Sequence, residues 1–238
     1  MTERTEELFR DDSYLKTCDA TVIEVNDRGG IVLDRTVFYY TGGGQPGDTG
    51  TLRFEGGEIR IGTTINVDGD IIHVPEDGQD LPSPGTPVTA EIDWDRRYSL
   101  MKMHTSMHLL CSLVPCGVTG GQVGADKSRL DFDVGDYTLD KEALTEALNR
   151  LIDEDHPLET MWISDADLDA NPDLVRTMSV QPPRNAGRVR LVKVGEAVDL
   201  QPCGGTHIAH TGEIGRLRVG KIENKGARNR RVNIHLEA

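Results

Sequence analysis

The sequence predicts an α+β protein in two parts, a small N-terminal β-barrel over residues 1–95 and an α+β domain over residues 96–238. Up to about residue 95 the chain alternates short β-branched runs with Gly, Asp-Gly and Pro, which is typical of strands joined by turns. Near residue 94 the apolar positions change to helical spacing. Beyond that point predicted helices alternate with further strand-like runs, which indicates an α+β domain with an antiparallel sheet.

Strand-like stretches of the N-terminal part cover residues 20–40, 49–54, 58–74 and 86–94. They are rich in β-branched residues and are interrupted or bounded by turn-forming residues. The regular spacing of such short strands is typical of a small barrel or a sandwich.

Two helices are predicted in the C-terminal part. The first covers residues 93–114, before Pro115, and its apolar residues recur at helical spacing: Leu100, Met103, Met107, Leu110 and Val114. The second lies within residues 138–154, with Asp140 as its expected N-cap and one apolar face: Ala143, Leu144, Ala147, Leu148 and Leu151. The remaining strand-like runs cover residues 128–134, 158–164, 187–194, 212–223 and 230–236.

The composition favours a cytoplasmic protein without membrane spans or disulfides. The first twelve residues, MTERTEELFRDD, are charged, and no stretch approaches the roughly 20 apolar residues that span a bilayer. The four cysteines lack the spacing of a disulfide scaffold, so we expect free thiols that are available as metal ligands.

The net charge of −14 argues mildly against nucleic acid as a partner, because affinity for phosphates comes mostly from Lys and Arg. One segment is an exception: from Arg216 to Arg231 seven basic residues accompany a single acid, Glu223, which gives a local charge of +6. This segment is either a solvated basic face or an RNA contact. The RNA-contact candidates within it are Lys225, Arg228, Arg230 and Arg231.

A glycine-rich stretch, TGGGQPGDTG, covers residues 41–50. Gly42, Gly44 and Gly47 satisfy the G-x-G-x-x-G spacing of dinucleotide-binding proteins, but Pro46 and a strand follow where that site requires a helix N-terminus. No G-K-[ST] follows either, which excludes a P-loop. By its residues alone the stretch is a loop between strands, although its glycines would let the backbone approach a ligand closely.

The motif HTSMH places His104 and His108 at positions i and i+4 of the first predicted helix, and therefore on one face. Such a pair also arises by chance, and each histidine by itself is more often packed or exposed than a metal ligand. Thr105 stands where zinc proteases of the H-E-x-x-H type carry their glutamate base, so that chemistry is unsupported.

A second pair, Cys203 and His207, lies in the stretch QPCGGTHIAH. Gly204 and Gly205 disfavour a helix here, so these two side chains would converge through a tight loop. A helix-borne histidine pair and a loop-borne cysteine and histidine together supply imidazole and thiolate, a ligand set that favours Zn²⁺ over hard cations. His210 is a spare histidine beyond this set.

Taken together, the stretches DWDRRYSLMKMHTSMHLL, QPCGGTH with TGEIG, ENKGARNRR and VLDRTVFYYTGGGQPGDTG resemble the alanyl-tRNA editing proteins of the free-standing AlaX type. The resemblance covers nearly the whole chain, in the family's order, and the lack of a long C-terminal extension is similar to the medium-length form. It implies an N-terminal β-barrel that carries the glycine motif. It also implies an α+β editing domain shared with alanyl- and threonyl-tRNA synthetases, without an aminoacylation domain.

The resemblance also implies site residues. It makes four side chains the zinc ligands: His104, His108, Cys203 and His207. It implies that the glycine loop and the helix contact the substrate through Gly42, Gly43, Gly44, Gln45, Gly47 and Thr105. Gln122 is similar to a glutamine downstream of the histidine pair in related editing domains and is the candidate catalytic residue. Met107 and His210 depart from the family's commoner threonine and asparagine.

The implied activity is hydrolysis of the ester that joins a wrong amino acid, serine foremost and glycine second, to the 3′ end of alanine tRNA. Zinc would polarise the ester carbonyl, activate water or orient the terminal ribose. Four protein ligands describe a closed site, however, whereas catalytic zinc normally keeps one position open. Two alternatives therefore remain: a non-catalytic RNA-binding module with a structural zinc, and a zinc hydrolase that acts on a small ester or amide.

Overall fold

The computed structural model describes residues 5–178 and 187–237 and divides the chain into two compact units, Met1–Tyr98 and Ser99–Ala238. Both units combine antiparallel sheets with few helices, so the predicted α+β class is confirmed. The long helix α1 (Trp94–Leu113) begins in the first unit and continues in the second.

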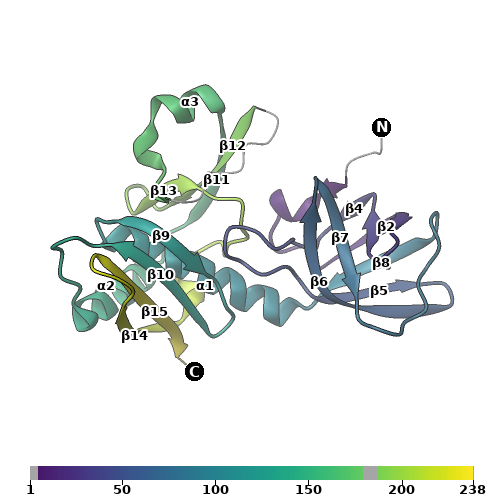
Figure 1. The fold of residues 1–238 in the computed structure, drawn as a ribbon, viewed down its shortest axis with the longest axis horizontal. Coiled ribbons are helices and arrows are strands. Elements are labelled where there is room, and N and C mark those ends of the chain that lie inside the picture. Colours follow the sequence, from purple (N-terminus) through teal and green to yellow (C-terminus); the bar gives the residue numbers. More distant parts are fainter. Residues whose placement is uncertain (1–4, 179–186, 238) are drawn as a thin grey trace. The chain divides into compact units, whose positions relative to one another are not determined.

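The N-terminal unit is a closed six-stranded barrel in the order β2-β3-β7-β6-β5-β8, with every neighbouring pair antiparallel (Figure 1). Its strands are β2 (Thr17–Val25), β3 (Ile31–Leu33), β5 (Gly50–Phe54), β6 (Gly57–Val67), β7 (Asp70–Pro75) and β8 (Pro87–Ile92). Apolar residues alternate into the barrel, as in β6, where Ile59 and Ile61 are buried between exposed neighbours. Because the six strands form a closed ring, the N-terminal unit is a barrel and not the sandwich that the strand spacing also allowed.

Short elements complete the N-terminal unit. Strand β1 (Glu6–Glu7) pairs in parallel with β4 (Arg35–Thr36), and a 3₁₀ turn covers Leu8–Arg10. The buried carboxylate of Asp48 forms an ion pair with the buried guanidinium of Arg97, near the start of α1, and accepts a hydrogen bond from Tyr39 N. A buried charge is stable only when it is paired and hydrogen-bonded, so this pair secures the end of the glycine loop within the unit.

The C-terminal unit contains a four-stranded antiparallel sheet in the order β14-β15-β10-β9. Its strands are β9 (Gly117–Gln122), β10 (Lys127–Asp133), β14 (Arg216–Asn224) and β15 (Asn229–Glu237). A second, three-stranded antiparallel sheet consists of β11 (Leu158–Ser164), β12 (Arg188–Val194) and β13 (Asp199–Pro202). The sequence did not predict β9 and β13: β9 contains three glycines, and β13 is four residues long and ends in Pro202.

Helix α2 (Lys141–Asp153) covers the outer edge of the four-stranded sheet. The side chain of its N-cap, Asp140, accepts a hydrogen bond from Ala143 N, as the sequence predicts. The side chain of Asn149 hydrogen-bonds both the N–H and the carbonyl of Leu217 in β14, which satisfies edge-strand groups that would otherwise be open to another chain. Two shorter helical elements follow β11, namely α3 (Asp165–Ala170) and a 3₁₀ turn over Pro172–Leu174, and a third, Thr211–Ile214, precedes β14.

Helix α1 differs from the amphipathic helix that its spacing predicts. From Leu100 to Cys111 every residue except Lys102 is buried, which includes the polar side chains of His104, Thr105 and His108. A helix that is buried on all sides lies in the interior of its domain. The polar residues of α1 therefore need partners inside the protein.

Candidate metal centre

The first half of the candidate site consists of His104 and His108 on α1, where one helical turn separates them. Their side chains lie on one face, with ring centroids 5.6 Å apart. Only 6% of His104 and 5% of His108 is exposed, so neither is a surface histidine. Buried imidazoles of this kind require partners or a metal.

The second half is the loop that follows β13. Its backbone is held by the buried side chain of Arg190, on β12, which donates hydrogen bonds to the carbonyls of Cys203 (3.0 Å) and Gly205 (2.9 Å). The N–H of Cys203 donates to Arg190 O at 3.1 Å, and the N–H of Gly205 donates to Cys203 Sγ at 3.4 Å. These bonds stabilise the tight turn that Gly204 and Gly205 indicate in the sequence. In this turn the Cys203 thiol and the His207 ring lie next to each other.

The two halves meet in one cluster. One ligand atom from each of four side chains, His104, His108, Cys203 and His207, lies within 4.8 Å of all the others, and this group could hold a metal ion. Cys203 Sγ lies 3.3 Å from His207 Nε2 and 3.6 Å from His104 Nε2. Atoms around one tetrahedral ion at bond lengths of 2.0–2.3 Å are separated by roughly 3.3–3.8 Å, so these distances suit a common metal.

Two hydrogen bonds orient the imidazoles. His108 Nδ1 donates to Asp199 Oδ2 at 2.7 Å, and the Asp199 side chain is only 4% exposed. His207 Nδ1 lies 3.2 Å from Thr105 Oγ1. In both cases the engaged Nδ1 leaves Nε2 free to face the cluster, which is how residues outside the coordination sphere fix the tautomer of a metal-binding histidine.

Gln201 completes this arrangement from the same face of β13. Its Nε2 donates to Asp199 Oδ2 at 2.8 Å and lies 3.1 Å from His108 Nδ1. Sequence reasoning missed both Asp199 and Gln201. The available signal was the two-residue spacing of Asp199 and Gln201, which puts both on one face of a strand, together with Cys203 directly after the strand ends.

The electrostatics of the cluster favour a thiolate among imidazoles. Burial raises the pKa of the Cys203 thiol, but the neighbouring imidazoles of His104 and His207 outweigh it and lower that pKa well below its ordinary value. Burial lowers the pKa of His207 to about 3, so this ring is a neutral ligand. Burial also lowers the pKa of His108, but the hydrogen bonds and charges of Asp199 and Cys203 outweigh burial and raise that pKa to about 10, so a metal would have to displace the proton from Nε2 of this ring.

The predicted substrate-binding loop belongs to the N-terminal unit. Gly43 and Gly44 have positive φ angles of 56° and 82°, and both are exposed. Gln45 and Gly47 are buried, and a Cβ at Gly47 would lie 1.9 Å from Thr64 O, so the turn itself requires that glycine. Gly42 pairs with Gln45 across the turn. Substrate contact by this loop stays a prediction.

Of the other predicted residues, Thr105 contacts a cluster histidine, whereas Gln122 and His210 form their hydrogen bonds and ion pairs with other residues. Thr105 is fully buried against His207, so the structure gives it an orienting role, and its predicted substrate contact stays a prediction. Gln122, the candidate catalytic residue, is exposed at the end of β9, where its Oε1 accepts a hydrogen bond from Arg129 Nε at 3.2 Å. His210 is exposed and lies 3.6 Å from a carboxylate oxygen of Asp155.

The four predicted RNA-contact residues all have local partners. Arg228 pairs with Asp133, Arg231 with Asp131, and Lys225 with Glu223, each at 2.8–2.9 Å. Arg230 donates to the carbonyl of Gly226, in the β14–β15 turn, at 3.1 Å, and to that of Asn229, at the start of β15, at 3.0 Å. Asp131 is buried, whereas Arg228 is largely exposed, so the pairs range from half-buried to surface contacts. The RNA contact stays a prediction.

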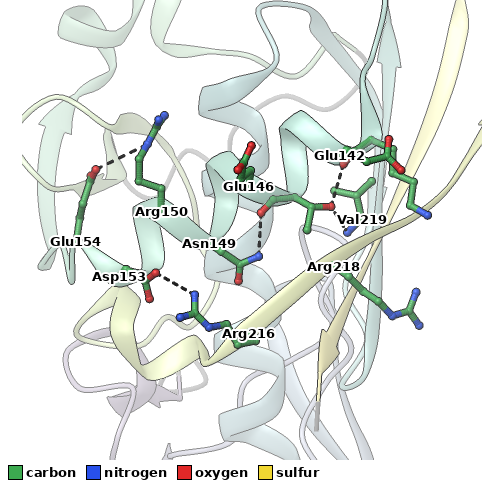
Figure 2. Close-up of a pocket in the computed structure, with 11 residues that line it drawn as sticks. Glu142, Glu146, Asn149, Arg150, Asp153, Glu154, Arg216, Arg218 and Val219 are labelled. Carbon is green, nitrogen blue, oxygen red and sulfur yellow. Dashed lines mark hydrogen bonds and ion pairs between the residues drawn. The ribbon is translucent and has the colours of Figure 1, made fainter.

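A surface depression of about 820 Å³ lies between α2 and β14 (Figure 2). Its charged lining residues are four cations and four acids: Lys141, Arg150, Arg216, Arg218, Glu142, Glu146, Asp153 and Glu154. Figure 2 shows Arg216 directed at Asp153 and Arg150 at Glu154. The depression contains none of the four cluster residues and has no formal net charge, so it is a seam between a helix and a sheet edge and not the candidate site.

Within residues 5–178 and 187–237, no helix has both the length and the apolar character needed to cross a membrane.

Two known families match parts of the chain. Residues 9–96 match the family described as tRNA synthetases class II (A), and residues 189–233 match the threonyl and alanyl tRNA synthetase second additional domain. The second match contains the loop half of the cluster, Cys203 and His207, together with its supports Asp199 and Gln201.

Individual relatives match nearly the whole chain. The alanyl-tRNA editing protein AlaX-M of Methanosarcina acetivorans is 38% identical over 96% of this chain and 97% of its own length. An alanine–tRNA ligase of Pyrobaculum calidifontis is 40% identical over 92% of this chain but only 25% of the ligase. The alanyl-tRNA editing protein AlaX-L of Pyrococcus horikoshii is 32% identical over 92% of this chain and 55% of that protein.

Proposed function

The chain belongs to the family of alanyl-tRNA editing proteins, and on that premise we propose that it hydrolyses the aminoacyl ester of alanine tRNA that carries a wrong amino acid. Serine is the principal substrate in this proposal, and glycine is the second. The observation that carries it is the cluster of three imidazoles and one thiol, assembled from residues about a hundred positions apart. The tRNA is the partner, and the reaction requires no ATP because ester hydrolysis is downhill.

The metal in this proposal is zinc. Imidazole nitrogens and a thiolate are the ligands that zinc prefers in proteins, and the donor distances of 3.3 and 3.6 Å suit tetrahedral coordination. When bound, zinc would supply a Lewis acid for the ester carbonyl or for a water molecule. His104, His108, Cys203 and His207 hold it, while Asp199 and Thr105 keep two of the imidazoles in the tautomer that presents Nε2.

Discrimination between serine and alanine has a simple physical basis. Serine exceeds alanine by one hydroxyl, which an apolar synthetic pocket rejects poorly, whereas a site that hydrogen-bonds this hydroxyl can favour it strongly. In such a site a polar group would lack its partner when alanyl-tRNA binds, so the correct product would survive. Gln122 remains the candidate catalytic residue, and the glycine loop with Thr105 remains the candidate substrate-contacting set.

A structural zinc in a non-catalytic RNA-binding module is the second candidate. The observation in its favour is that the cluster supplies four protein ligands, which is the number found in closed structural sites. The third candidate, a hydrolase of small esters or amides, requires the same metal but no tRNA.

Deacylation of purified seryl-tRNA(Ala), with alanyl-tRNA(Ala) and a small ester in parallel, tests the proposal. We expect hydrolysis of the seryl ester, sparing of the alanyl ester, and loss of both zinc and activity in His104→Ala. Full deacylation by a zinc-free His104→Ala protein would refute a direct role of the metal. Binding of tRNA without hydrolysis would favour the structural module, and turnover of the small ester alone would favour the third candidate.

A further inference from the structure

Basic residues gather on the four-stranded sheet of the C-terminal unit. The strands β9, β10, β14 and β15 with the turn between the last two contain nine Lys or Arg and four Asp or Glu, so the sheet carries a formal charge of +5. The whole chain carries −14, so the remainder carries −19. A local excess of this kind is unusual for an acidic protein and creates a positive potential over one sheet.

Most of these cations near the β14–β15 turn are neutralised by acids. The pairs Arg228 with Asp133, Arg231 with Asp131 and Lys225 with Glu223 account for three of them. At the opposite end of β14, Arg216 forms an ion pair with Asp153 of α2, at 2.9 Å. An anionic partner would have to compete with these acids for the paired cations.

In the part of the chain that the structure describes, one row of three residues across the sheet contains cations that are not paired with acids. Lys127 of β10 and Arg218 of β14 each lie directly opposite His235, on the strand between them. Residues directly opposite in neighbouring strands share one face, so the three side chains form a continuous row, which we call the Lys127–Arg218 row. The His235 ring lies across Gly220, where a Cβ would come within 2.6 Å of its Nε2.

The two outer members of the row are exposed cations. Within residues 5–178 and 187–237, neither Lys127 nor Arg218 forms an ion pair with an acid. Figure 2 shows the Arg218 guanidinium directed away from α2, whereas Arg216 is directed at Asp153. Burial lowers the pKa of His235, and the charges of Arg218 and Lys127 lower it further, which shows that both cations act on the same imidazole.

Lys127 and Arg218 lie on the two strands that flank β15, so at the usual strand spacing of about 4.7–4.9 Å their strands are about 10 Å apart. Two separate cations at this spacing suit a chain of regularly spaced negative charges better than a single small anion, because each cation can contact a different charge.

We propose that the Lys127–Arg218 row binds the sugar-phosphate backbone of the tRNA substrate. The proposal rests on the proposed function for the identity of the partner, and on the charge and register of the sheet for the location of the surface. Lys127 and Arg218 contact phosphates, and His235 lies between them as a neutral hydrogen-bonding group. The contact positions the RNA and carries no sequence information, as is usual for phosphate contacts.

The test measures binding of uncharged alanine tRNA to the full chain as a function of salt concentration. Each phosphate contact contributes about 0.7–0.9 to the slope of log affinity against log salt, so Lys127→Ala and Arg218→Ala should each reduce the slope by about that amount. The double variant should lose about twice as much. Arg216→Ala is the matched control, because this residue lies two positions away in the same strand and on the same face but is paired with Asp153.

We expect Arg216→Ala to leave the slope close to that of the unsubstituted protein, and Lys127→Arg with Arg218→Lys to restore it. An unchanged slope in the double variant would overturn the proposal, as would equal losses in Arg216→Ala and Arg218→Ala. Competition by a polyglutamate peptide as effective as that by RNA would assign the surface to an acidic protein instead. Circular dichroism and thermal unfolding of every variant establish that folding is intact.

The proposed function is tested separately on the unsubstituted protein. If the unsubstituted protein hydrolyses seryl-tRNA and the double variant keeps the full salt slope, only the proposed RNA-binding surface is refuted. Absence of hydrolysis together with the expected loss of slope would refute the proposed function alone.

Discussion

Replacement of Asp199 by alanine should weaken metal binding at the cluster without unfolding the protein. The Asp199 carboxylate is buried and accepts a hydrogen bond from His108 Nδ1 at 2.7 Å, which keeps Nε2 of that ring directed at the metal. A hydrogen bond to a charged group contributes about 1.5–3 kcal/mol. Because 1.4 kcal/mol corresponds to a factor of ten, we expect metal affinity to fall about 10- to 100-fold, as is typical for residues that orient a ligand.

The matching conservative variant is Asp199→Asn. An amide oxygen can still accept the Nδ1–H bond but lacks the charge, so we expect an intermediate loss of about tenfold. The assay is competition for zinc against a chelator of known affinity, supported by the absorption spectrum of the cobalt-substituted protein, which reports the coordination geometry. Asp153→Ala is the control, because Asp153 is an exposed acid of the same unit that pairs with Arg216.

Zinc affinity of Asp199→Ala within about threefold of the unsubstituted protein would refute the orienting role, since the hydrogen bond would then contribute less than the lower limit given above. An equal loss in Asp153→Ala would assign the effect to general charge. Thermal unfolding of the metal-free proteins separates loss of affinity from loss of fold.

Three further predictions concern stability, each measured by denaturant unfolding. Arg97→Ala leaves the buried carboxylate of Asp48 without its cation and should lower the free energy of unfolding by about 3–5 kcal/mol; a loss below about 1 kcal/mol would contradict this. Burial lowers the pKa of His73 to about 4, so the unfolded chain takes up a proton below pH 6.5 that the folded protein does not. Stability should therefore fall by about 3 kcal/mol as the pH decreases from 6.5 to below 4, and His73→Leu should lack this component; identical pH dependence of both proteins would exclude it. Asn149→Ala removes two hydrogen bonds to Leu217 and should cost about 1–3 kcal/mol, whereas an unchanged unfolding midpoint would show that water replaces them.

Much of the fold was predictable because the relevant signals are local. The Asp140 cap and the apolar periodicity located α2, and β-branched runs located most strands. Strand β9 was not predicted because its three glycines remove the β-branched pattern. At Gly121 a Cβ would lie tightly against the Leu130 side chain, at 3.0 Å, whereas at Gly120 the nearest atom would lie at an ordinary 3.5 Å. In α2 the buried stripe is Leu144, Leu148 and Ile152, whereas Ala143 of the predicted face is exposed and Ala147 and Leu151 are half-buried.

The candidate site divides in the same way. The spacing of His104 and His108 on a helix and the Cys-Gly-Gly-x-His loop were visible in the sequence, and the structure brings both pairs into one cluster. The roles of Asp199 and Gln201 were not visible, because they depend on which helix residue β13 faces. Arg190 likewise holds the loop from a strand that pairs with β13.

The sequence by itself determined the α+β class, the helix that carries two histidines and the turn that carries the cysteine. These follow from periodicity and from glycine and proline chemistry, which act over a few residues. Only the tertiary structure decided that the strands close into a barrel, that a carboxylate orients His108, and that Lys127 and Arg218 flank His235. Strand register and side-chain pairing are set by contacts between residues distant in the chain, and local sequence patterns do not specify them.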